Sequence, residues 1–182
     1  MIYKYLIPEY SHWHWLIDRR LVNLGVLCPE AAAFSARVRE ALLQVKSHRR
    51  KGCSLMFVKT IVNSWSTSYR YHEPVLLPCI LGCEGCHDTL EHYLSCDILW
   101  TISCTALGLD TGWLNLAFPQ RFGHPVPNMI HIKLNAVMFK VYYPLRKEFS
   151  QMISLSISDK DFSDIQSRSL FLANHFASEI ID

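Results

Sequence analysis

The residues most suited to chemistry in this chain are four cysteines and two histidines that fall within the eighteen residues from Cys79 to Cys96. Thiolate sulfur and imidazole nitrogen are the preferred ligands of Zn²⁺, and a structural site uses four of them in a tetrahedron. The chain has seven cysteines, an odd number, so complete pairing into disulfides within the chain is excluded. Clustering of this kind favours a metal over disulfides. The segment 76–100 is therefore predicted to bind one structural zinc ion.

Two ligand sets fit the spacing, and the preferred one is Cys79, Cys83, His92 and Cys96. The first two cysteines are four residues apart with Gly82 between them, and a glycine-bearing turn can point both sulfurs inward. His92 and Cys96 are also four residues apart, which would place them on one face of a helix.

The alternative set uses Cys83, Cys86, His92 and Cys96, which span fourteen residues. This span matches a zinc knuckle of the retroviral type, but the histidine stands one position later than in that motif. Cys79 and Cys86 compete for the same coordination position in the two sets, and the spacing alone leaves both open.

Two stretches around this cluster resemble a known family. The order Cys79-x3-Cys83-x8-His92-x3-Cys96, preceded by the stretch 65–70, resembles the CCHC-type zinc-binding segment that follows the polymerase in reverse transcriptases of non-LTR retroelements. The stretch 90–96 carries the clearest likeness, and the resemblance covers roughly residues 55–100. It implies a structural zinc on the preferred ligand set, an origin in a retroelement, and association with other retroelement proteins.

The catalytic motifs of the obvious enzyme classes are missing. A polymerase palm needs paired aspartates for its metal ions, and the sequence has no Asp-Asp dipeptide. It also has no Gly-x-Ser-x-Gly elbow, no glycine-rich phosphate loop and no His-Glu-x-x-His motif. We therefore expect no enzymatic activity.

Charge is unevenly divided along the chain, which favours nucleic acid as a partner of its first half. Residues 1–72 carry 11 Lys and Arg against 4 Asp and Glu, whereas residues 73–182 carry 7 against 12. A basic cluster at the end of a predicted helix would contact the phosphates of RNA or DNA without reading sequence. Its members are Lys46, Arg49, Arg50 and Lys51, with support from Arg37, Arg39 and Lys59.

Two other readings of the surface stay open. The chain can instead be a zinc-stabilised protein-interaction module or a purely structural one, with the basic cluster facing an acidic partner. Tyr69 and Tyr71, on either side of Arg70, could stack on unpaired bases or could anchor their own loop in the core.

Apolar residues recur at the helical period through most of the chain, so we expect an all-α fold. A first helix follows Cys28-Pro29, with Phe34, Val38, Ala41, Leu42 and Val45 inside. A second begins near Ser54 and buries Leu55, Val58, Ile61, Val62 and Trp65, leaving Lys59 and Asn63 outside.

Further helices are expected around and beyond the metal ligands. Thr89 can cap a short helix that continues through His92, Cys96 and Trp100. A long helix with Ile130, Leu134, Val137, Val141 and Leu145 inside should kink or end at Pro144. A last helix starts around Ser158 and turns inward Phe162, Ile165, Ser169, Leu172 and Phe176. One short hairpin is allowed, near residues 76–81.

Composition supports a single globular unit over residues 1–182. Half of the residues are hydrophobic and 19% are charged, which is enough apolar surface to offset the entropy of ordering. No continuous apolar, charge-free stretch is long enough to span a membrane, and the first residues lack the pattern of a secretory signal. We expect an intracellular protein, cytoplasmic or nuclear.

Overall fold

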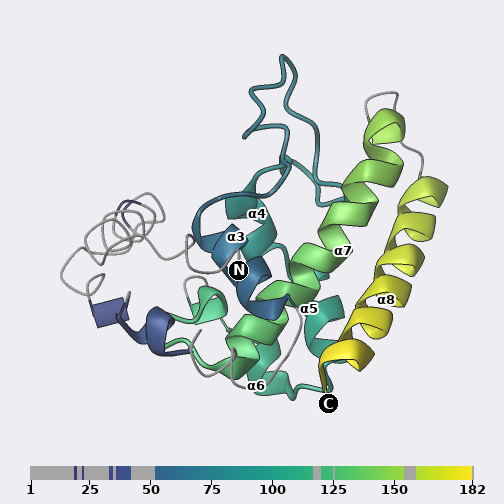
Figure 1. The fold of residues 1–182 in the computed structure, drawn as a ribbon. Helices are drawn as coiled ribbons and strands as arrows, with labels where there is room; N and C mark the ends of the chain where they lie inside the picture. Colours follow the sequence, from purple (N-terminus) through teal and green to yellow (C-terminus); the bar gives the residue numbers. More distant parts are fainter. Residues whose placement is uncertain are drawn as a thin grey trace.

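The computed structural model describes Arg19, Val22 and residues 33–34, 36–41, 52–116, 120–124, 126–153 and 159–181. These residues form helices and connecting turns, with no strand among them, so the all-α prediction is confirmed (Figure 1). The elements are α3 (Cys53–Ile61), α4 (Leu90–Ser95), α5 (Asp97–Ala106), α6 (Thr111–Leu114), the 3₁₀ turn η3 (Gln120–Phe122), α7 (Met129–Ile153) and α8 (Asp159–Ile181). None of the described helices is both long and apolar enough to cross a membrane.

Helix α7 is the centre of the fold. Helices α3 and α8 both pack against it, and α5 contacts α7 and α8 (Figure 1). The predicted inner positions Leu134, Val137, Val141 and Leu145 are buried, as the helical period requires. The sequence predicted that Pro144 would kink or end this helix. An end there is wrong, because α7 continues as a helix to Ile153.

Helix α3 begins one residue before the predicted start and is rotated relative to the predicted face. Its buried residues are Cys53, Phe57, Thr60 and Ile61. The predicted inner residues Leu55, Val58 and Val62 are only half-buried. The predicted inner residues Ile61 and Trp65 are buried, so the prediction is confirmed for these two. It was wrong for the other three because apolar residues occur on almost every side of this helix, so that packing on α7 decides which face is buried.

The helix predicted through His92, Cys96 and Trp100 is two helices. Thr89 caps α4 as expected, its hydroxyl accepting a hydrogen bond from the His92 N–H at 3.1 Å. Cys96 has an extended backbone (φ −66°, ψ 108°) and stands between α4 and α5. His92 and Cys96 therefore come together across a bend rather than along one helical face.

The remaining predictions are met in part. Phe34, Val38 and Ala41 are buried on a helical stretch, whereas Cys28, Pro29, Leu42 and Val45 lie outside the described residues, as does Ser158. On α8, Ile165, Ser169 and Leu172 are buried and Phe162 and Phe176 are half-buried. The allowed hairpin amounts to one antiparallel bridge, Pro78 with His87.

Candidate metal centre

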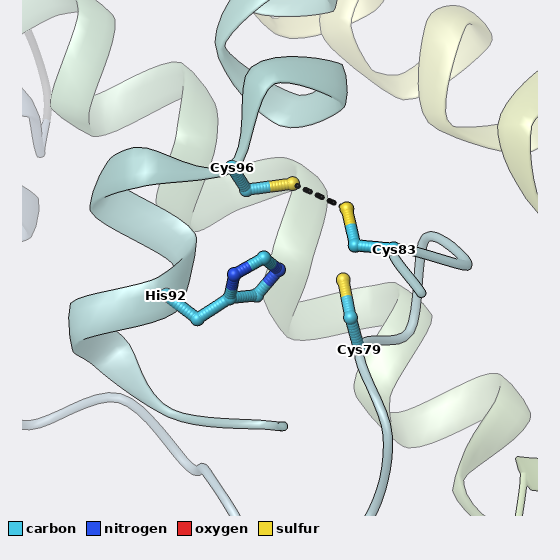
Figure 2. A group of neighbouring side chains, drawn as sticks. All are labelled: Cys79, Cys83, His92 and Cys96. Carbon is cyan, nitrogen blue, oxygen red and sulfur yellow. Dashed lines mark hydrogen bonds between the residues drawn. The ribbon is translucent and has the colours of Figure 1, made fainter. Parts of the chain in front are cut away.

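Two segments bring together the side chains of Cys79, Cys83, His92 and Cys96. The two leading cysteines come from the loop before α4, His92 from α4, and Cys96 from the bend after it (Figure 2). Cys79 and Cys96 are buried, and Cys83 and His92 are half-buried. All four potential ligand atoms lie within 4.8 Å of one another.

The separations suit one small tetrahedral ion. Two sulfurs bound at about 2.3 Å to the same tetrahedral zinc stand roughly 3.8 Å apart. The sulfurs of Cys83 and Cys96 are 3.5 Å apart, and the whole group fits within the 4.8 Å limit. This cluster could therefore hold a metal ion with only small side-chain adjustments.

The electrostatics of the three thiols also fit a cation. A hydrogen bond from the Cys96 thiol lowers the pKa of Cys79 to about 4, which makes Cys79 the favoured thiolate. The pKa of Cys96 is raised because its thiol donates a hydrogen bond to Cys79. Burial raises the pKa of Cys83 to about 11. Only one of the three sulfurs thus ionises easily by itself, and a divalent cation would stabilise the thiolate forms of the other two.

His92 supplies the clearest sign that the cluster is built for a ligand. Its Nε2 is buried and has no hydrogen-bond partner among the described residues. Figure 2 shows the ring turned toward the three sulfurs, with one nitrogen facing them. A buried polar atom without a partner costs roughly 1–3 kcal/mol, and coordination to a metal would satisfy this one.

Cys86, the ligand of the alternative set, does not belong to the group of converging atoms. Its backbone instead supports the loop, since its carbonyl accepts a hydrogen bond from the Cys79 N–H at 2.8 Å. Its own N–H donates to the Cys83 carbonyl at 3.3 Å. The geometry therefore favours the set that includes Cys79.

The loop between Cys79 and Cys83 has the backbone that a metal-binding turn requires. The Leu81 N–H donates to the Cys79 sulfur at 3.4 Å, a contact that stabilises a thiolate. Gly82 follows with φ +84°, and a Cβ there would lie 2.8 Å from the Phe162 ring of α8. Glycine is thus needed both for the turn and for the close approach of α8.

A buried carboxylate, which the sequence did not reveal, fixes this loop to the helices. Asp88 accepts hydrogen bonds from the Tyr93 hydroxyl at 2.9 Å and from the Ser68 N–H at 2.6 Å. Arg146 of α7 lies 3.2 Å from the same carboxylate. The Tyr142 hydroxyl lies 3.1 Å from it, although its single proton is shared with the Ser66 carbonyl at 2.9 Å.

Tyr93 also connects this network to residues 79–83, which we call the metal-binding loop. The Tyr93 hydroxyl accepts a hydrogen bond from the N–H of Ile80, the residue after Cys79, at 3.2 Å. Burial raises the pKa of Tyr93, so its hydroxyl keeps the proton that it donates to Asp88. No sequence signal marks Asp88, because its partner Tyr142 stands 54 residues away.

The predicted nucleic-acid contacts are divided between described and undescribed residues. Lys46, Arg49, Arg50 and Lys51 lie outside the described residues. Arg37 and Arg39 are exposed on a helical stretch. The Lys59 ammonium lies 5.0 Å from the centre of the Phe139 ring and is half-buried.

Comparisons with protein families, with curated proteins and with solved structures found no match to this chain. The functional conclusions below therefore depend on the site itself and on the resemblance in residues 55–100.

Proposed function

We propose that this chain is a zinc-stabilised helical module, of retroelement origin, that binds nucleic acid and has no polymerase or nuclease activity of its own. The main support for a zinc site is the convergence of four potential ligand atoms within 4.8 Å, one of which is the unpartnered Nε2 of His92. Three sulfurs and one imidazole favour Zn²⁺ over Mg²⁺ or Ca²⁺, which prefer oxygen.

The proposed role of zinc is structural rather than catalytic. Cys79, Cys83, His92 and Cys96 would fill all four tetrahedral positions and leave none for water or substrate. When bound, the ion supplies a crosslink between the loop and the bend at Cys96. The residues themselves hold the loop against α4 through the hydrogen bond that the Ile80 N–H donates to the Tyr93 hydroxyl.

Nucleic-acid binding is proposed from the resemblance and from the basic first half of the sequence. RNA or DNA would meet Lys46, Arg49, Arg50 and Lys51, with Arg37, Arg39 and Lys59 in support. These contacts would be to phosphates, so affinity should depend on salt more than on base sequence.

A second candidate is a protein-interaction module. It is favoured by two exposed apolar side chains near the metal-binding loop, Val75 at 72% and Leu76 at 39%. Exposed apolar groups of this kind are common where another protein docks.

Metal analysis tests the first part of the proposal. Protein purified under reducing, chelator-free conditions should contain one zinc per chain and lose helicity on chelation, because such sites contribute folding free energy. A folded, metal-free protein would refute the zinc centre.

A salt titration separates the two candidate functions. Binding to RNA or DNA whose log affinity falls linearly with log salt supports nucleic acid. Replacing Lys46, Arg49, Arg50 and Lys51 with Ala should flatten that slope and leave the zinc content unchanged. No binding at low salt would leave the protein-interaction module.

A further inference from the structure

The sequence left two roles open for Tyr69 and Tyr71, stacking on unpaired bases or anchoring their own loop in the core, and the structure distinguishes between them. Their side chains are 53% and 61% exposed, so they do not anchor the loop in the core. Thr67 and Ser68, the two residues before them, are almost completely buried and hold the loop instead. We call residues 69–72 the aromatic turn.

The backbone of the aromatic turn is fixed by hydrogen bonds at both ends. The N–H groups of Tyr71 and Glu73 donate to the carbonyls of Thr67 and Ser68, each at 3.1 Å. The Ser68 N–H donates to Asp88, which ties this turn to α7 and to the metal-binding loop. The Tyr71 hydroxyl lies 3.5 Å from the Ser66 hydroxyl, so this ring is oriented by its own loop while it remains exposed. Exposed rings on a fixed backbone lose little freedom when they bind a ligand.

The charges at the aromatic turn suit an anion. Arg70, which stands between the two tyrosines in the sequence, is exposed. The nearest acidic residue in sequence, Glu73, is paired with Arg146 at 2.7 Å and so does not neutralise Arg70. A ring, a guanidinium and a second ring in succession offer two stacking faces and one phosphate contact.

From this arrangement we propose that the aromatic turn binds unpaired bases of single-stranded nucleic acid, with Tyr69 and Tyr71 stacking on bases and Arg70 contacting phosphate. The proposal rests on nucleic-acid binding as the function of the chain and names the form of nucleic acid and the residues that select it. Paired bases in a duplex offer no free faces, so the rings should contribute to binding of single strands only.

The test uses the full-length, zinc-loaded protein and labelled oligonucleotides of about 12 nucleotides, within the usual site size of such surfaces. Oligo(dT), oligo(rU) and a mixed-sequence DNA duplex are titrated by fluorescence anisotropy at several salt concentrations. The two single-stranded arms show whether DNA or RNA is preferred. Tyr69→Leu/Tyr71→Leu removes both π faces, whereas Tyr69→Phe/Tyr71→Phe keeps them.

The double Leu variant should bind single strands roughly tenfold or more weakly for each lost ring, at an unchanged salt slope, because the rings are neutral. The double Phe variant should bind within about twofold of the parent, and duplex binding should not change in either. Arg70→Gln should flatten the slope by about 0.7, the value for one phosphate on a single strand.

Phe171→Leu is the matched control, since Phe171 lies on α8 and is 60% exposed, as Tyr71 is. It should leave all binding unchanged. Zinc content and helicity should match the parent in every variant, because the altered side chains are exposed.

Failure of this inference differs from failure of the proposed function. If the parent binds single strands and the double Leu variant binds them equally well, or loses duplex affinity to the same degree, the stacking role is wrong while nucleic-acid binding stands. The exposed rings would then point to a protein contact. If the parent binds no oligonucleotide at low salt, nucleic-acid binding itself is wrong.

Discussion

Individual side chains decide which of two overlapping candidate zinc motifs could hold a metal ion. Both contain Cys83, His92 and Cys96, and they differ only in Cys79 or Cys86. The sulfur of Cys79 is buried within the ligand group, whereas Cys86 contributes backbone hydrogen bonds. The sequence identified the candidates, but only the folded loop shows which sulfur reaches the other ligands.

Cys79→Ser should therefore weaken zinc binding by more than about 100-fold, beyond the loss typical of a supporting contact. Cys86→Ser, the matched control, should bind zinc within a few-fold of the parent. Competition with a chromophoric chelator measures both affinities. A stronger loss in Cys86→Ser would transfer the assignment to the knuckle-like set.

A buried histidine away from the metal centre should make stability depend on pH. Burial lowers the pKa of His131 to about 4 from its ordinary 6.5, so the unfolded chain binds the proton more tightly. The contribution of His131 to the free energy of unfolding should then be fully present above pH 6.5 and be lost as the pH drops toward 4. Between pH 7 and 4.5, the parent should lose about 2 kcal/mol more of its unfolding free energy than His131→Gln does.

Denaturant titrations of both proteins across this pH range provide the measurement. Protonation of the metal ligands affects parent and variant alike and cancels in the difference. Parallel pH profiles would show that His131 is not the source of the dependence.

The elements of the fold were predictable where one apolar stripe dominates. The buried positions of α7 and α8 follow the helical period, and the Thr89 cap marks the start of α4. The inner face of α3 was predicted correctly at Ile61 but not at Leu55 and Val58, because apolar residues surround that helix. The break at Cys96 was missed because the residue types there suit a helix, while the turn from α4 into α5 places Cys96 in an extended backbone.

The contact between Gly82 and α8 should contribute to the stability of the fold. Gly82→Ala adds a Cβ to a residue with φ +84°, 2.8 Å from the Phe162 ring, so the loop must strain and α8 must shift. We expect a loss of about 2 to 3 kcal/mol in stability and weaker zinc binding.

Gly85→Ala is the control for this change. Gly85 also has a positive φ, +67°, but a Cβ there would meet nothing within 4 Å. This variant should lose only the backbone contribution, about 1 kcal/mol. Equal losses in the two variants, measured by thermal and denaturant unfolding, would show that contact with α8 is unimportant.

For the molecule as a whole, Asp88 is the group that joins separate parts. Its carboxylate links the segment before the metal-binding loop, through Ser68, to α4 through Tyr93 and to α7 through Arg146. Nothing in the local sequence distinguishes it from a surface aspartate, because all of its partners except Tyr93 are distant in sequence. Long-range polar pairing of this kind was the part of the site that periodicity and spacing could not supply.

Asp88→Asn removes the charge that faces Arg146 but keeps the shape of the side chain. We expect a loss of about 2 to 4 kcal/mol, since a buried cation would lose part of its compensation. Glu148→Gln removes one partner of the half-exposed pair with Arg168 and should cost less than about 1 kcal/mol. Urea unfolding of the zinc-loaded proteins compares the two, and similar small losses would contradict the linking role.

The short span of the ligand set has a consequence for how the chain is made. All four ligands lie within eighteen residues, so the loop that they close is short and its closure entropy is small. During synthesis from the amino terminus, residues 79–96 leave the ribosome before α7 exists, and the cluster can capture its ion at that stage. Asp88 gains its contacts with Tyr142 and Arg146 only later, when α7 has been made. If the cluster binds its ion first, the two long carboxyl-terminal helices would pack onto a loop that is already closed.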